Sequence, residues 1–96
     1  MPTVRIEHGI HDFDTWKAAF DRDPAGRKRS GVQHYQILRP VDDPAYIMID
    51  LDFGTTAEAE SFLEMMKKVW SSPQAAPALA GKPQTRIVER VESADL

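Results

Sequence analysis

The apolar residues of this chain change their spacing in an order that few folds accommodate. In the first run they recur at every second residue, and in the next at every third or fourth. Two successive runs then return to every second residue. A further run at every third or fourth residue follows, and the last run is again at every second. Alternation by two is typical of half-buried strands, and spacing by three and four is typical of amphipathic helices. The pattern therefore predicts the element order β-α-β-β-α-β.

The first strand is predicted over residues 3–10. Its apolar side carries Val4, Ile6 and Ile10, with polar residues alternating between them. His8 falls on the same apolar side. Since successive side chains of a strand point to opposite faces, we expect the His8 imidazole to lie between the sheet and the helices.

The first helix follows this strand. Asp12 or Asp14 can accept hydrogen bonds from the backbone N–H groups of its first turn, and the helix must end near Asp23, before Pro24. Its sheet-facing stripe is aromatic and consists of Phe13, Trp16 and Phe20. The loop that follows contains three successive cations, Arg27, Lys28 and Arg29. They form either a solvated loop or a group that gathers an anionic or phenolate ligand at the mouth of a pocket.

Two further strands are separated by a turn at residues 41–44, where Asp and Pro residues are typical of turns. Pairing Leu38 with Ile47 would point His34 toward the helices. A slip of one residue would reverse the faces and point Tyr35 toward them instead. We favour the first register.

The second helix is predicted over residues 56–71 by a capping box, in which Thr55 and Glu58 each satisfy the other's backbone N–H. Its apolar stripe consists of Ala59, Phe62, Leu63, Met66 and Trp70. Residues 84–92 return to the alternation of a strand. No linker or strong repeat divides the chain, so we expect a single domain over residues 1–96.

Four segments carry a resemblance to known proteins: HDFDTWKAAFD, RKRSG, LRPVDDPAYIMIDLDF and PALAGKPQTRIVERVE. With the element order, they resemble the dimeric α+β barrel superfamily of ferredoxin-like proteins, and specifically its small cyclase-like and antibiotic-biosynthesis-monooxygenase-like members. The resemblance implies an α+β fold in which a four-stranded antiparallel sheet has both helices on one face. It also implies a homodimer whose two sheets pack to close a barrel.

At two sites the sequence differs from members of the superfamily whose chemistry is known. Haem-binding relatives carry a histidine on the second helix, and residues 56–71 contain none. Quinone-forming relatives without a cofactor use an asparagine and a tryptophan, and this chain has no asparagine, so Trp16 or Trp70 supplies at most half of that pair. We therefore expect no haem. The chain also has no Gly-rich phosphate loop, so we expect no other cofactor.

The candidate site combines histidines with an aromatic wall. His34 and His8 are the candidate catalytic bases, because an imidazole changes its charge near neutral pH. The alternative is that each is a hydrogen-bonded structural histidine. The candidate ligand-binding residues are Trp16, Phe20, Tyr35, Phe62, Met66 and Trp70. Aromatic and methionine walls are typical of small-molecule pockets, although such residues also form ordinary cores.

These features leave two functions open. The first is a cofactor-independent monooxygenase or a cyclase that acts on an aromatic or polyketide-type metabolite. In this scheme a histidine generates a phenolate or enolate, and Tyr35 orients an oxygen. The second is a non-catalytic dimer that binds a small ligand or acts as a stress-type protein. Whether the chain is an enzyme is therefore not decided by the sequence.

Composition argues against other partners. A net charge of −3 gives no general attraction for nucleic acid or an anionic membrane, and no apolar run is long enough to span a bilayer. Without cysteine, neither a disulfide nor a thiolate metal site is available, and the three histidines lack the spacing of metal ligands. We expect a cytoplasmic protein without a metal site, in which Asp50 and Asp52 pair with cations such as Arg5 or Arg39 on the far face of the sheet.

Overall fold

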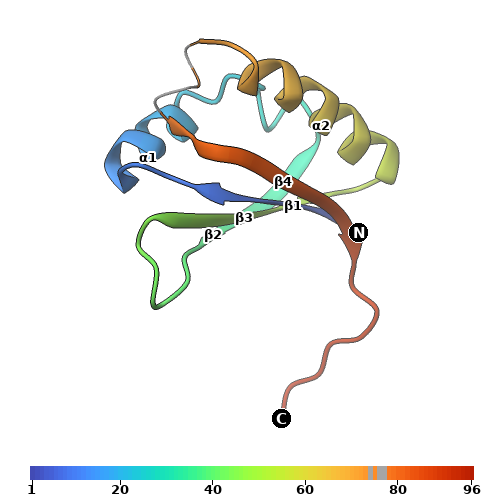
Figure 1. Cartoon of the computed structure of the whole chain (residues 1–96). Coiled ribbons are helices and arrows are strands. Elements are labelled where there is room, and N and C mark those ends of the chain that lie inside the picture. The colour runs from blue at the N-terminus through green and yellow to red at the C-terminus, as the bar shows by residue number, and fades with distance from the viewer. Residues whose placement is uncertain (74, 76–77) are drawn as a thin grey trace.

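The structure is a computed structural model that describes residues 1–73, 75 and 78–96. Its elements follow the predicted order (Figure 1): β1 (Pro2–Gly9), α1 (Phe13–Asp21), β2 (Val32–Leu38), β3 (Tyr46–Phe53), α2 (Thr56–Trp70) and β4 (Ala80–Glu89). The strands form one antiparallel sheet in the order β2-β3-β1-β4. Both helices lie on the same face of this sheet (Figure 1). The ferredoxin-like α+β fold predicted from the sequence is therefore confirmed.

Both helices begin at the predicted caps. Asp12, rather than Asp14, caps α1, because its Oδ2 accepts a hydrogen bond from the Thr15 backbone nitrogen at 2.9 Å. At α2 the capping box is complete: Glu58 N donates to Thr55 Oγ1 at 3.1 Å, and Thr55 N donates to Glu58 Oε1 at 3.1 Å. A side-chain cap of this kind stabilises a helix by about 1 kcal/mol.

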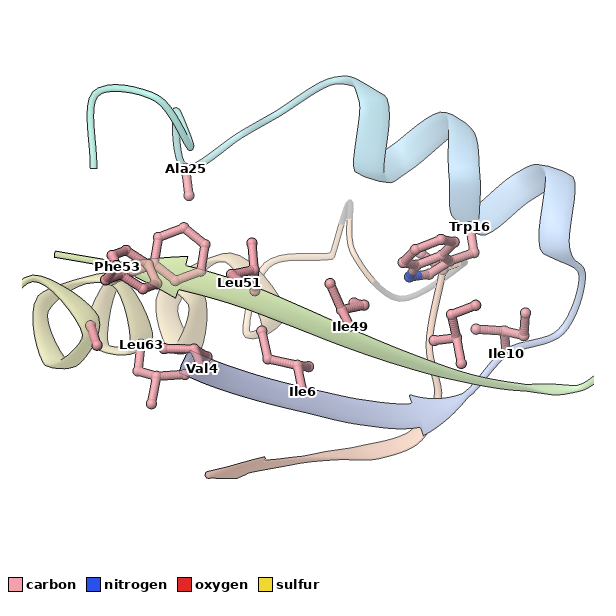
Figure 2. Packing of buried hydrophobic residues seen from close by; sticks show 13 residues of the cluster. Val4, Ile6, Ile10, Trp16, Ala25, Ile49, Leu51, Phe53 and Leu63 are labelled. Carbon is pink, nitrogen blue, oxygen red and sulfur yellow. The ribbon is translucent and has the colours of Figure 1, made fainter. Parts of the chain in front are cut away.

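The core lies between the helices and the sheet (Figure 2). Its centre is formed by the two inner strands, β1 and β3, whose buried residues include Val4, Ile6, Ile47, Ile49, Leu51 and Phe53. At one end Phe53 packs against Phe62 of α2 with ring centroids 5.3 Å apart. At the other end Trp16 of α1 lies above Ile49 (Figure 2). Each such buried side chain contributes roughly 1.5–3 kcal/mol to stability.

The register of the β2–β3 hairpin differs from the one that we favoured. Leu38 lies opposite Met48 and not opposite Ile47. Tyr35 therefore shares a face with the core residues of β3, and His34 lies on the face away from the helices. The favoured register is wrong, and the one-residue slip is the register that forms.

A β-bulge explains this difference. Val32 lies opposite Phe53, but the next paired residue of β2 is His34, which lies opposite Asp52. Gln33 is thus the extra residue of β2, and it shifts every later side chain of that strand to the other face. Without the bulge, His34 would share the face of Val32. No Gly or Pro marks the bulge in the sequence of this strand.

The last strand begins earlier and ends earlier than predicted, at Ala80–Glu89 instead of 84–92. Because β4 is an edge strand, it tolerates Pro83, which has no N–H to donate to a neighbour. In the described part of the chain, no helix is long and apolar enough to cross a membrane. Nor do three His, Asp or Glu side chains of those residues gather as a metal site would require.

Polar pairs lie along the part of the sheet face opposite the helices where Arg5, Asp50 and Asp52 are found. Arg5 forms a bidentate pair with Asp50, with Nε–Oδ1 and Nη2–Oδ2 distances of 2.8 and 2.9 Å. This arrangement holds the pKa of Asp50 below its ordinary value, chiefly because Arg5 donates a hydrogen bond to the carboxylate. Asp52 accepts a hydrogen bond from Thr3 Oγ1 at 2.6 Å. The predicted pairing of Asp50 with Arg5 is confirmed.

Candidate functional site

A cavity of about 410 Å³ lies between the two helices and the sheet. This volume lies within the usual range of small-molecule sites, roughly 300–1,000 Å³. The floor comes from β1 and β3, and the walls come from α1, α2 and the segments that follow each helix. Its principal apolar lining residues are Ile6, Ile49, Leu51, Trp16, Phe20, Met66 and Trp70.

Four of the six predicted ligand-binding residues line this cavity: Trp16, Phe20, Met66 and Trp70. The other two do not line it. Tyr35 lies behind Phe20, with the two rings edge to face and their centroids 5.1 Å apart. Phe62 is buried against Phe53 and borders a separate, open hollow of about 660 Å³.

The aromatic wall follows from the helical spacing of α1. Trp16 and Phe20 are four residues apart and therefore lie on the same face of the helix, one turn from each other. Their rings stack with centroids 5.1 Å apart and an angle of 27° between their planes. Phe13 extends the row on the other side of Trp16, at a centroid distance of 5.9 Å. Of these three rings, Trp16 and Phe20 line the cavity and form its aromatic wall.

His8 lies at the floor of the cavity, beside this wall. Its residue is only 3% exposed, and its ring centroid is 6.5 Å from that of Trp16. Its Nδ1 lies 2.7 Å from the carbonyl oxygen of Gly9. A carbonyl oxygen only accepts hydrogen bonds, so Nδ1 carries the proton, and Nε2 of the neutral ring carries the free lone pair.

The Nε2 atom of His8 is open to the cavity. It makes no hydrogen bond with any described residue, whereas no fully buried side-chain nitrogen or oxygen of those residues lacks a partner. Nε2 is therefore not fully covered by protein atoms, and the space available to it is the cavity that His8 lines. The His8 imidazole thus presents a proton acceptor to whatever occupies this space.

Burial keeps His8 neutral. Its loss of contact with water lowers the pKa of His8 below the ordinary value of 6.5, and the hydrogen bond to the Gly9 carbonyl only partly opposes this effect. At neutral pH the ring is consequently uncharged and able to accept a proton. The floor of the cavity therefore carries a neutral imidazole that is able to accept a proton.

His34, the other candidate base, lies on the opposite face of the sheet. The prediction that its side chain points between sheet and helices is wrong, because the bulge at Gln33 reverses its direction. Its side chain is 68% exposed, and its Nδ1 is 3.3 Å from Asp52 Oδ2. His34 is not among the residues that line the cavity. The sheet therefore separates the two histidines.

Most of the charged residues that line the cavity are not predicted from the sequence. The charged side chains that line it are Arg22, Asp23, Arg27 and Lys68. The sequence predicts only Arg27 among them, as one member of the basic cluster with Lys28 and Arg29. The available signal was weak, because nothing in the spacing of that cluster distinguishes the member that points inward from the two that remain exposed.

Neither a protein-family model nor a curated protein matches this sequence. Solved structures do match it. SnoaB, a cofactor-independent oxygenase from Streptomyces nogalater, is 15% identical with a TM-score of 0.69, over 96% of this chain and 94% of its own. A Bordetella bronchiseptica protein assigned as an antibiotic biosynthesis monooxygenase is 14% identical with a TM-score of 0.76, over 95% and 97%. A dimeric ferredoxin-like protein from an uncultured marine organism is 10% identical with a TM-score of 0.65, over 97% of both chains. The resemblance inferred from the sequence is thus confirmed at the level of the fold.

Proposed function

We propose that this chain is a homodimeric enzyme that oxygenates a hydroxylated aromatic compound without a cofactor, using His8 as its general base. The observation that carries the proposal is the buried, neutral imidazole of His8, whose Nε2 opens onto a cavity with an aromatic wall. The similarity of the fold to SnoaB, a cofactor-independent oxygenase, supports this class of reaction.

The first step is removal of a proton. A phenol stacked along Trp16 would place its hydroxyl within hydrogen-bond reach of His8 Nε2, at about 2.6–3.2 Å. Transfer of the phenolic proton to Nε2 gives a phenolate and an imidazolium. The Gly9 carbonyl, which already accepts the Nδ1 hydrogen, orients the ring and stabilises the positive charge.

The second step requires no reductant other than the substrate. The electron-rich phenolate transfers electrons to dioxygen and forms a carbon–oxygen bond. One oxygen atom remains on the ring as a new carbonyl, and the other leaves as water with two hydrogens from the substrate. The products are one quinone and one water for each phenol and dioxygen, which balances four electrons. The apolar walls keep bulk water away from the reactive anion.

The homodimer is proposed from the sheet face that no described helix covers. Leu38 is 40% exposed there, and Met48 lies directly opposite it. A domain of this size buries only a modest fraction of its surface. Burying this apolar strip between two subunits would therefore stabilise the protein. The solved structures of similar fold include a dimeric ferredoxin-like protein. A cytoplasmic location stays a prediction from the sequence.

Oxygen uptake tests the proposal. The protein, treated with a chelator, is given a panel of naphthols and hydroxyanthracenes in an oxygen electrode. We expect one dioxygen consumed for each quinone formed, and a loss on the order of a hundredfold in His8→Gln. His11→Gln is the matched control, because His11 is exposed and does not line the cavity.

Three outcomes would separate the alternatives. Turnover of a polyketide-type compound without oxygen uptake would favour a cyclase instead of an oxygenase. Binding of the panel without any turnover would favour the non-catalytic ligand-binding function. Turnover that is unchanged in His8→Gln would remove His8 from the mechanism.

A further inference from the structure

The basic cluster after α1 separates into one inward and two outward cations. Arg27 lines the cavity, and its side chain is only 18% exposed. Lys28 and Arg29 are exposed and do not line it. The oxygenation proposed above gives no role to Arg27, so a separate reason is needed for this half-buried cation at the cavity.

Arg27 is held in place from several sides. Its Nη1 donates a hydrogen bond to the Phe20 carbonyl oxygen at 2.8 Å, and its Nε lies 3.5 Å from Asp23 Oδ1. The guanidinium carbon lies 3.9 Å from the centre of the Phe20 ring and 5.2 Å from that of Tyr35. A guanidinium fixed in this way loses little freedom when it binds a further partner.

Arg27 retains donors for a ligand. A guanidinium has five N–H groups, and the contacts above engage Nη1 and Nε. Nη2 makes no hydrogen bond with any described residue. Two parallel N–H groups are the geometry that binds a carboxylate most strongly.

The charged residues that line the cavity are mostly cations, in a protein that is anionic overall. Its charged lining residues are three cations, Arg22, Arg27 and Lys68, and one carboxylate, Asp23. The whole chain carries a net charge of −3. This local excess of positive charge favours an anionic ligand over a neutral one.

The base and the cation lie at different ends of the aromatic wall. His8 is next to Trp16, and Arg27 is next to Phe20. Trp16 and Phe20 are one helical turn apart, about 6 Å along the helix axis. A ligand that reaches both ends therefore has to extend past one aromatic ring, as fused rings do.

We infer that the ligand of this cavity is a fused-ring aromatic acid, with its phenolic hydroxyl at His8 Nε2 and its carboxylate at Arg27. The inference rests on the proposed function for the position of the hydroxyl. It goes beyond that function by naming the charge of the substrate and the residue that selects it. Arg27 is then a binding residue that fixes which end of the substrate meets the base.

Calorimetric titration with three matched compounds tests this inference. The first is a hydroxynaphthoate whose hydroxyl and carboxylate lie at opposite ends of the fused rings, the second is its methyl ester, and the third is the corresponding naphthol. We expect the acid to bind about tenfold more tightly than the ester or the naphthol, because only the acid forms charge-assisted hydrogen bonds with Arg27. This comparison needs no variant, so it does not depend on how a mutant folds.

Variants then locate the effect. Arg27→Gln should abolish the preference for the acid while leaving the affinity for the ester nearly unchanged. Arg29→Gln is the matched control, since it removes the same charge from the same loop outside the cavity. An ester that binds the wild-type protein as tightly as the acid, or a preference that survives Arg27→Gln, would overturn the inference. So would the failure of all three compounds to bind.

The same titrations keep this inference distinct from the proposed function. An Arg27-dependent preference for the acid, together with oxygen uptake that does not depend on His8, would support the anion site and contradict the mechanism. The converse, His8-dependent turnover without a preference for the acid, would leave the mechanism standing and overturn the inference.

Discussion

The imidazole of His8 and the indole of Trp16 lie with their ring centroids 6.5 Å apart and their planes at 59°, and both rings line the same cavity. His8 comes from β1, and Trp16 comes from α1. The surroundings of His8, the proposed base, therefore depend on how α1 packs on the sheet. Stability and catalysis are expected to be linked at this contact.

Replacing Trp16 by Ala should lower the free energy of unfolding by about 3 kcal/mol, because its side chain is 4% exposed and packs on three other rings. Denaturant unfolding followed by circular dichroism measures this loss. Trp70→Ala, at a half-buried position on α2, should cost less. A loss below about 1 kcal/mol for Trp16→Ala would show that this side chain does not hold α1 to the sheet.

The lowered pKa of His8 predicts how stability depends on pH. In the unfolded chain His8 takes up a proton as the pH falls through 6.5, whereas in the folded chain it stays neutral to a lower pH. The unfolded state then binds more protons, so the free energy of unfolding decreases as the pH falls below this value. His8→Gln should make the stability less dependent on pH between neutral pH and the lowered pKa. An unchanged dependence would mean that the folded state does not hold His8 neutral.

Asp50→Ala tests the ion pair on the far face of the sheet. It removes two hydrogen bonds from Arg5 and should cost about 1.5 kcal/mol, at the low end for charged pairs because the Arg5 side chain is 43% exposed. Asp21→Ala, which breaks the exposed pair with Lys17, is the control and should cost about 0.5 kcal/mol or less. Equal losses in thermal unfolding would show that burial of Asp50 adds nothing.

Substitution on the uncovered sheet face tests the proposed dimer. Light scattering of the wild-type chain should give twice its mass of 10.8 kDa. Leu38→Asp places a charge on the exposed apolar strip and should yield a folded monomer. A wild-type monomer at micromolar concentration, or a dimer that is unaffected by Leu38→Asp, would contradict this interface.

The fold could be predicted from the sequence because each element carries its own local signal. The caps at Asp12 and Thr55 and the stripes of both helices depend only on spacing along the chain. For the same reason Trp16 and Trp70 could be assigned to the sheet-facing stripes of their helices, and both line the cavity. Within a regular helix, periodicity is enough to assign a side chain to a face.

The direction of His34 could not be obtained in this way. It depends on Gln33, a bulged residue that resembles any other polar residue of a strand. Only the contacts of the whole sheet select this register, in which Tyr35 packs against Phe20. The inward direction of the Arg27 side chain could not be predicted for a similar reason. It is set by contacts with Phe20 and Asp23 that form only when the loop packs on α1.

The dependence of kcat/KM on pH tests the central claim, that a neutral, buried His8 is the base. For a phenol that the protein oxygenates, kcat/KM should rise with pH, reach its midpoint below 6.5, and be flat at neutral pH, because this quantity reports the pKa of the free enzyme's base. His8→Gln should lose both the rate and the midpoint. A rate that does not depend on pH across this range, or a midpoint that persists in His8→Gln, would contradict the account.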